Sequence, residues 1–257
     1  MEAPSVQSLE RAFSLLEALA EKPHGETLAA LAGQTGLNKS TAHRLLANLM
    51  KLGYVTQDEE SHRYYLTIKL FEIGSGVVHK TDILQFAKPY LIRASQVIGE
   101  VINLAVPNNN DVLFIYVEEG GKNAARVASH VGTRNPMYCT ACGQAILATY
   151  SDEEIEKFWK TSSIVKYTNN TITDFQQLMT RIQLVRKTGY AIECEESENG
   201  IGCIAVSIID YSGKAQGAIS VSAPASRLNE AYIRVVAESL VGVGKKISMH
   251  FGKTEWK

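Results

Sequence analysis

One segment of the chain combines cationic and hydrogen-bonding side chains with a complete lack of acids. Between residues 27 and 57 the sequence contains Lys39, Arg44 and Lys51 but neither Asp nor Glu. Helical spacing over residues 39–52 separates an apolar side from a polar one. The polar side carries Ser40, His43, Arg44, Ala47, Asn48 and Lys51. A narrow basic face of this kind suits the major groove of DNA, which is about 12 Å wide.

The side chains of this face suit different contacts with a duplex. Arg44 can form a bidentate contact with a guanine, whereas Lys51, farther from the helix start, suits a phosphate. Ser40 and Thr41 lie in the first turn, where hydroxyls and free backbone N–H groups donate to phosphate. His43 is a weaker candidate, because such a histidine is more often a surface or packing residue. The predicted DNA-binding set is Lys39, Ser40, Thr41, His43, Arg44, Asn48, Lys51 and Arg63.

Two further helices are expected to position this one. Apolar spacing predicts a helix over residues 5–21 and a second over 28–34, with Thr27 as its cap. Gly36 permits a tight turn before the third helix, which Asn38 is expected to cap. The apolar side of the third helix is predicted to carry Ala42, Leu45, Leu46, Leu49 and Met50.

A hairpin is predicted after the third helix. The runs 54–57 and 63–67 are rich in β-forming residues and flank the polar stretch 58–62. The acids at 58–60 would repel phosphate, so only Arg63 at the hairpin base remains a candidate contact. Three helices and a hairpin are the arrangement of a winged helix-turn-helix. The alternative is an ordinary surface helix with a solvated basic face, which requires neither the turn nor the hairpin.

The rest of the chain alternates predicted helices and strands. Helices are expected over 83–98, 141–150, 152–159, 174–187 and 229–250, and strands over 101–106, 112–117, 190–194, 203–210 and 216–222. The run 123–129 is a candidate for another strand. Hairpin-connected strands with helices gathered at the ends indicate an α+β domain around an antiparallel sheet.

Small and polar residues in this second part could form a pocket for a metabolite. Residues 139–143, Cys-Thr-Ala-Cys-Gly, place small side chains at a predicted helix start, where free N–H groups attract an anion. Ser220 and Ser222 share one face of a strand, and Cys203 with Ala205 and Ser207 shares a face of its neighbour. The alternative is that this alternation marks the solvent side of the sheet.

Cys139 and Cys142 allow a metal or redox interpretation. Two thiolates at this spacing can bind one tetrahedral zinc ion. A second closely spaced ligand pair is missing from the sequence, and no thioredoxin-like context surrounds the two cysteines. Small buried thiols are therefore the preferred interpretation.

An enzyme would need a nucleophile or acid-base groups. Cys203 could be a nucleophile, and Glu193, Glu195, Glu196 and Glu198 could act as acids, bases or metal ligands. No Gly-x-Ser-x-Gly, His-Glu-x-x-His or phosphate-binding loop supports this activity. We therefore expect the glutamates to form a solvated loop and the protein not to be an enzyme.

Several motifs resemble those of the IclR family of bacterial transcriptional regulators. Residues 36–46, Gly-Leu-Asn-Lys-Ser-Thr-Ala-His-Arg-Leu-Leu, followed by Leu-Gly-Tyr-Val at 52–55 and Tyr-Leu at 65–66, are similar to its DNA-binding half. Residues 134–141, 200–206 and 219–224 resemble its effector domain. The resemblance covers nearly the whole chain in the right order.

This resemblance implies a GAF-like effector domain, dimers or pairs of dimers, and a palindromic operator. In that family the small-molecule contacts fall on positions that match Ala141, Cys142, Glu193, Cys203, Ser220 and Ser222. Glu193 stands where an Asp is frequent, which changes the expected depth of the pocket. The implied effector is a small carboxylate or sugar acid.

The composition is that of a globular protein. The 257 residues are 45% apolar, with 26 Lys+Arg against 27 Asp+Glu, so an indiscriminate nucleic-acid coat is not expected. No secretory signal or apolar run of about 18 to 20 residues is visible. We therefore expect a cytoplasmic protein with four reduced cysteines and no membrane association.

The expected protein is a ligand-responsive, sequence-specific transcriptional regulator, a repressor of a catabolic operon, that works as a homodimer or homotetramer. We expect a winged helix-turn-helix at 1–67, a linker helix at 68–81 and a GAF-like α+β effector domain at 82–257. No cofactor, metal or catalytic residue is expected. The alternatives are a metal- or redox-sensing regulator that uses Cys139 and Cys142, and a stand-alone metabolite-binding protein.

Overall fold

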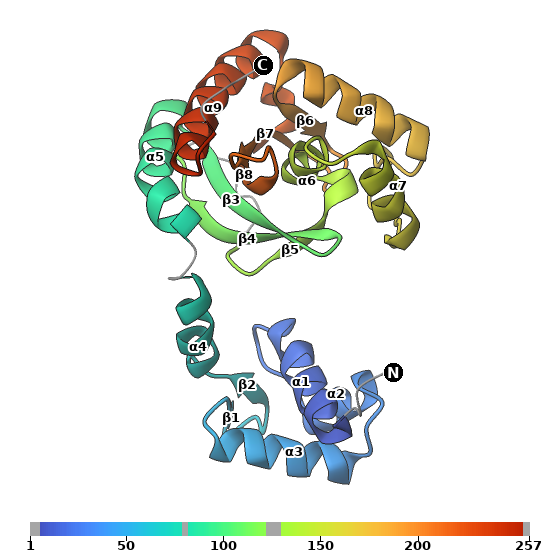
Figure 1. The fold of residues 1–257 in the computed structure, drawn as a ribbon. Helices are drawn as coiled ribbons and strands as arrows, with labels where there is room; N and C mark the ends of the chain where they lie inside the picture. Colours follow the sequence, from blue (N-terminus) through green and yellow to red (C-terminus); the bar gives the residue numbers. More distant parts are fainter. Residues whose placement is uncertain (1–5, 79–81, 122–129, 254–257) are drawn as a thin grey trace. The chain divides into compact units, whose positions relative to one another are not determined.

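The computed structural model describes residues 6–78, 82–121 and 130–253 of the chain. Contacts divide the chain into two compact units, residues 1–80 and 81–257. Figure 1 shows the elements of both units. The assignment of residues 68–81 as a linker stays a prediction, as does the candidate strand at 123–129, which lies outside the described residues.

The N-terminal unit is a winged helix-turn-helix, as predicted. Its elements are α1 (Gln7–Ala20), α2 (Leu28–Gln34), α3 (Lys39–Lys51), β1 (Val55–Gln57), β2 (Tyr64–Leu66) and α4 (Lys69–Val78). Thr27 caps α2 by accepting the Ala30 N–H, and Gly36 has a φ of +66° that favours glycine in the turn before α3. Leu15, Leu31 and Leu46 are completely buried and hold the three helices together.

Two local predictions in this unit were correct only in part. Asn38 occupies the N-cap position of α3, but its side chain makes no capping hydrogen bond. Met50 is 38% exposed, so it does not belong to the buried side of the helix. The buried positions are Ala42, Leu46 and Leu49, and residue 50 is rotated by about 100° from residue 49.

The C-terminal unit contains a six-stranded antiparallel sheet. Its order is β5-β4-β3-β8-β7-β6. The strands are β3 (Val101–Asn108), β4 (Asp111–Glu118), β5 (Arg134–Pro136), β6 (Ala191–Cys194), β7 (Ile201–Ile209) and β8 (Ala215–Pro224). Every pair is antiparallel, which confirms the α+β class. Among the strands that the structure describes, only the short β5 was missed, because Arg-Asn-Pro lacks apolar alternation.

Helices cover both faces of this sheet (Figure 1). On one face lie α5 (Asp82–Ile98) and α9 (Glu230–His250), and on the other lie α6 (Ala141–Leu147), α7 (Asp152–Thr161) and α8 (Phe175–Thr188). This unit also contains two 3-10 turns among its described residues, η1 (Met137–Cys139) and η2 (Ala225–Arg227). No helix in the described part of the chain is long and apolar enough to cross a membrane.

The two sheet faces carry side chains of different size. Toward α5 and α9 the central strands present large groups, such as Ile204 and Ile219. Toward α6 they present small ones, such as Ala205 and Ala218. Because strand side chains alternate between faces, the same sequence that fills one core leaves space beneath α6. The candidate effector residues lie at this space.

Candidate functional site

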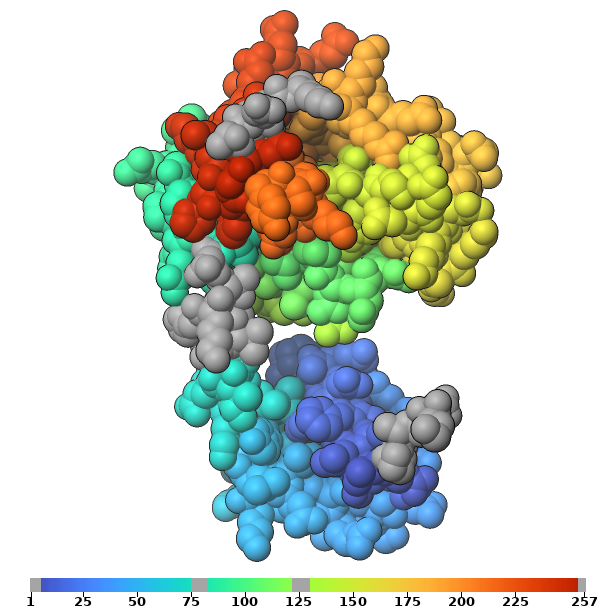
Figure 2. Space-filling view, viewed as in Figure 1, coloured from blue at the N-terminus to red at the C-terminus, as the bar shows by residue number. Residues whose placement is uncertain are grey.

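The predicted DNA-reading face of α3 is open to solvent. Lys39, Ser40, His43, Arg44, Asn48 and Lys51 are exposed, and Thr41 is half-buried. Figure 2 shows the surface of this helix, in light blue, uncovered by other segments of its unit on the viewed side. Within the part of the chain that the structure describes, no acidic side chain forms an ion pair with Lys39, Arg44 or Lys51. Their charges are therefore available to a polyanion.

Arg63 lies at the hairpin base but already has partners in its own unit. Its Nη1 donates to the carbonyl of Gly25 at 3.0 Å and lies 3.8 Å from Oε1 of Glu26. The side chain is still 42% exposed. Arg63 therefore fastens the hairpin to the connection between α1 and α2, while its role toward DNA stays a prediction.

The predicted effector residues all line one small cavity in the C-terminal unit. They are Ala141, Cys142, Glu193, Cys203, Ser220 and Ser222, joined by Phe114, Asn135, Thr140, Ser197, Glu198 and Ile201. The sheet register explains the convergence, since Cys203 pairs with both Glu193 and Ser222 on neighbouring strands. The cavity measures about 40 Å³. Metabolite pockets are roughly 300 Å³ or larger, so this one must open to admit such a ligand.

The start of α6 forms one wall of the cavity. A Cβ atom on Gly143 would lie 2.2 Å from Cα of Met137, so glycine lets η1 and α6 approach each other closely. Thr140 caps α6 by accepting the Gly143 N–H at 3.2 Å and donates to the carbonyl of Pro136 at 2.9 Å. The prediction of free N–H groups at this helix start therefore does not hold for Gly143.

Asn103 is a site residue that sequence reasoning missed. It is completely buried on β3, and its Nδ2 donates to the hydroxyls of Ser220 at 3.3 Å and Ser222 at 3.0 Å. Both serines therefore keep their own hydroxyl protons for other acceptors. The available signal was one amide in the otherwise apolar run 101–106.

Glu193 is a buried carboxylate whose two oxygens have different surroundings. Its side chain is 1% exposed. Oε1 accepts the N–H groups of Glu196 at 2.5 Å and Ser197 at 3.2 Å, whereas Oε2 has no hydrogen-bond partner among the described residues. Burial raises the pKa of Glu193 to about 7, although the two N–H donors and the Cys203 side chain oppose this change. The group can therefore exchange a proton near neutral pH.

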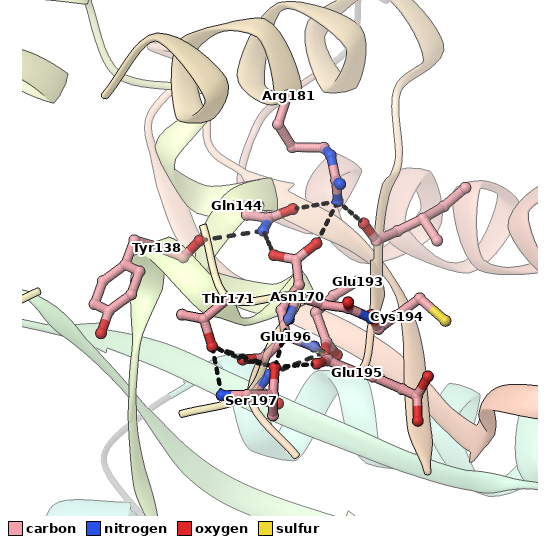
Figure 3. A network of polar contacts seen from close by, with 12 residues as sticks. Tyr138, Gln144, Asn170, Thr171, Arg181, Glu193, Cys194, Glu195, Glu196 and Ser197 are labelled. Atoms are coloured by element: carbon pink, nitrogen blue, oxygen red, sulfur yellow. Dashed lines mark hydrogen bonds and ion pairs between the residues drawn. The ribbon is translucent and has the colours of Figure 1, made fainter. Parts of the chain in front are cut away.

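Glu196 is also buried, so the prediction of a solvated glutamate loop was wrong for two of its four members. Figure 3 shows its carboxylate between Gln144 and Arg181. Arg181 Nη1 lies 2.8 Å from Oε1, and Gln144 Nε2 donates to Oε2 at 2.8 Å. Arg181 also donates to the carbonyl of Ile192. These contacts join α6, α8 and β6 beside the cavity, which the local sequence does not reveal.

A larger open groove lies between α8 and β6. It measures about 620 Å³ and is lined by residues that include Leu184, Tyr190 and Cys194. Arg181 and Glu196 line this groove, but none of the predicted effector residues does. None of the described residues that line this groove has a buried side-chain polar atom without a hydrogen-bond partner, whereas Glu193 in the smaller cavity has one.

Cys142 and Cys203 line the cavity, whereas Cys139 lies in η1 before the start of α6. Burial raises the pKa of both Cys139 and Cys142 to about 12, and it raises the pKa of Cys203 well above its ordinary value. Metals and oxidants react with thiolates, which are rare at such a pKa. Within the described residues, no group of three His, Cys, Asp or Glu side chains could hold a metal ion.

Comparison with known proteins identifies the family. Residues 8–59 match the IclR helix-turn-helix domain, and residues 75–249 match the C-terminal domain of the bacterial transcriptional regulator IclR. The chain is 33% identical over 250 residues to the DNA-binding transcriptional repressor YiaJ of Escherichia coli, covering 96% of this chain and 89% of YiaJ. It is 32% identical over 248 residues to the transcriptional regulator KdgR of the same organism, covering 96% and 94%.

The fold comparison agrees with the sequence comparison. The crystal structure of the Thermotoga maritima IclR has a TM-score of 0.79 with this chain at 28% identity, and the match covers 96% of this chain and 100% of the other. Both units of the structure are therefore accounted for by one family. The chain belongs to the IclR family of bacterial transcriptional regulators.

Proposed function

We propose that the protein is a ligand-responsive repressor that binds a specific operator through α3. The observation that carries this proposal is the exposed cationic face of α3, which no acidic side chain of the described residues neutralises. Arg44 would read a guanine, and Lys39, Ser40, Thr41 and Lys51 would contact phosphates. YiaJ, which is named a DNA-binding transcriptional repressor, supports the direction of regulation.

A palindromic operator requires two copies of the chain. One reading helix per chain recognises one half-site, and a two-fold dimer presents two helices to two half-sites. The N-terminal unit exposes large apolar side chains on α1 and at α4, including Leu9 (57%), Phe13 (59%) and Phe71 (64%). We propose that a second copy of the chain covers these side chains.

The effector would bind in the cavity below α6. Hydroxyls of Ser220 and Ser222, fixed by Asn103, suit the oxygen atoms of a small carboxylate or sugar acid. Since the cavity is about 40 Å³, a ligand would favour a more open conformation of its walls. A coupling of about 1 to 3 kcal/mol between this change and the spacing of the reading helices would alter operator occupancy by roughly 5- to 150-fold.

Operator binding can be tested by selection from a pool of random duplexes. The selected sequences should share a palindromic consensus, and fluorescence anisotropy should show preference for it over competitor DNA with a steep salt dependence. A protein that binds all duplexes equally, or none, would refute the regulator function. A stand-alone metabolite-binding protein would give the second result.

A further inference from the structure

The cavity has a charge pattern that is unusual for an anion site. Two carboxylates, Glu193 and Glu198, are among its lining residues, whereas none of the described residues that line it is Lys, Arg or His. An anionic ligand beside an ionised and buried Glu193 would experience like-charge repulsion in a medium of low dielectric constant. Neutral hydroxyl donors alone do not remove this repulsion.

The geometry of Glu193 offers a way to remove the repulsion between this carboxylate and an anionic ligand. Oε1 is occupied by two backbone N–H donors, so the carboxyl group is held in place. Oε2 is buried and has no hydrogen-bond partner within the described chain. A proton on Oε2 would make this oxygen a donor, and a ligand carboxylate is a strong acceptor for it. The wall would then change from a negative to a neutral, donating surface.

We propose that the cavity binds a small hydroxy or keto acid in its anionic form, and that binding is coupled to the uptake of one proton from solvent by Glu193. The ligand keeps its charge, the proton resides on Oε2, and a carboxyl–carboxylate hydrogen bond forms. This inference rests on the proposed effector site and adds the regulation of that site by pH.

None of the described side chains that line the cavity is a cation that could neutralise Glu193, although the thiol of Cys203 faces it and lowers its pKa. Cys203 on β7, with Cys139 and Cys142 around the start of α6, have raised pKa values and remain neutral thiols. Glu196, which follows β6, adds negative charge, and Arg181 from α8 is engaged by the Glu196 carboxylate and the Ile192 carbonyl.

The pKa of Glu193, raised to about 7 by burial, places this uptake in the physiological range. An anion bound next to Glu193 would raise its pKa further, so the proton and the ligand would favour each other's binding. Above a pH of about 7, affinity should therefore fall toward tenfold for each pH unit.

The test begins with the full chain and matched pairs of probes. Thermal shifts are measured at pH 6.0 and 8.5 with glycolate, D-glycerate, pyruvate and D-gluconate, and with the neutral glycolamide, glycerol, pyruvamide and D-glucitol. We expect at least one acid to stabilise the protein more strongly at the lower pH. Calorimetry with that acid, in buffers of different ionisation enthalpy, should then show uptake of close to one proton at pH 8.

Two variants make the assignment specific. Glu193→Gln is permanently neutral, so its affinity for the acid should be independent of pH and its binding should take up no proton. Glu198→Gln removes the exposed carboxylate of the same cavity and should retain the proton uptake. Specific operator binding and thermal unfolding of both variants would verify that they are folded.

Three outcomes would overturn the proposal. They are stabilisation by no acid at pH 6.0, stronger stabilisation by the neutral partners, and an unchanged pH dependence in Glu193→Gln. Each would leave the regulator function standing as long as the wild type selects its palindromic DNA. Loss of that selection would instead refute the proposed function itself.

Discussion

Arg44 and Lys51 are both exposed cations of α3, but they should contribute to DNA binding in different ways. Arg44→Ala should cost about 1 to 3 kcal/mol and relax the preference at one base pair, because the proposed bidentate guanine contact would be lost. Lys51→Ala should weaken binding to all DNA sequences about equally. It should also reduce the slope of log affinity against log salt concentration by about one. Anisotropy with single-base operator variants at several salt concentrations would measure both. Uniform weakening in Arg44→Ala would reassign that residue to phosphate.

Glu193 should make the stability of the C-terminal unit depend on pH. Burial raises its pKa from 4.5 to about 7, so the folded chain holds the proton more tightly than the unfolded chain. The stabilisation of the folded chain by protonated Glu193 is complete below pH 4.5 and is lost as the pH rises through about 7. The full change corresponds to roughly 3 kcal/mol.

Urea unfolding of wild type and Glu193→Gln between pH 4 and 8 would measure this contribution. As the pH rises across that window, the unfolding free energy of the wild type should fall relative to that of Glu193→Gln. Comparison of the two proteins removes the titration of Glu196, which both retain. Parallel profiles would show that Glu193 titrates at an ordinary pKa.

Local patterns predicted most elements because each depends on residues that are close in sequence. Thr27, Gly36 and the apolar spacing of α3 act within one or two helical turns, and they placed the helix-turn-helix correctly. β5 escaped because its three residues become a strand only through pairing with β4. Strand alternation placed Ser220 and Ser222 on one face, but which face is buried depends on the helices that cover it.

The polar partners of the cavity could not be predicted from local patterns. Asn103 contacts Ser222 across 119 residues, and Gln144 contacts Glu196 across 52. A buried glutamate is costly unless it is paired, so nothing in the run 193–198 by itself indicates burial. The burial of Glu196 depends on its contacts with Arg181 and Gln144, which come from other elements of the fold.

The exposed side of α1 should hold two chains together. Leu9 and Phe13 are one turn apart and are 57% and 59% exposed. Phe13→Glu would place a charge in the proposed interface, so the chain should become monomeric at micromolar concentration and bind the palindrome more weakly. Ser8→Glu adds the same charge on another side of α1 and serves as the control. Sedimentation equilibrium would distinguish them, and a dimeric Phe13→Glu would place the interface elsewhere.

Because the chain is divided into two units, each unit can be stabilised by its own core. The N-terminal unit has its own core, built around Leu15, Leu31 and Leu46, and the C-terminal unit has a core on each face of its sheet. A substitution in the cavity therefore need not disturb the reading helix. Effector sensitivity and operator affinity should be separable by mutation, which would not be expected of a site shared between the units.

The pair Ser222→Ala and Cys203→Ala tests this separation. The two side chains lie opposite each other on β7 and β8, with Oγ and Sγ 3.3 Å apart, so their removal deletes neighbouring hydrogen-bonding groups of one cavity wall. Operator affinity without ligand should stay within about twofold of wild type, because α3 and its core are unchanged. The response to the acid identified by thermal shift should be lost, since a coupling free energy cannot exceed the difference in ligand affinity between the two states. Ser207→Ala, on the same face of β7 but absent from the cavity lining, is the control and should respond normally. An undiminished response in the double variant would show that the effector binds elsewhere. The proposed DNA contacts would then still be tested by the Arg44→Ala experiment.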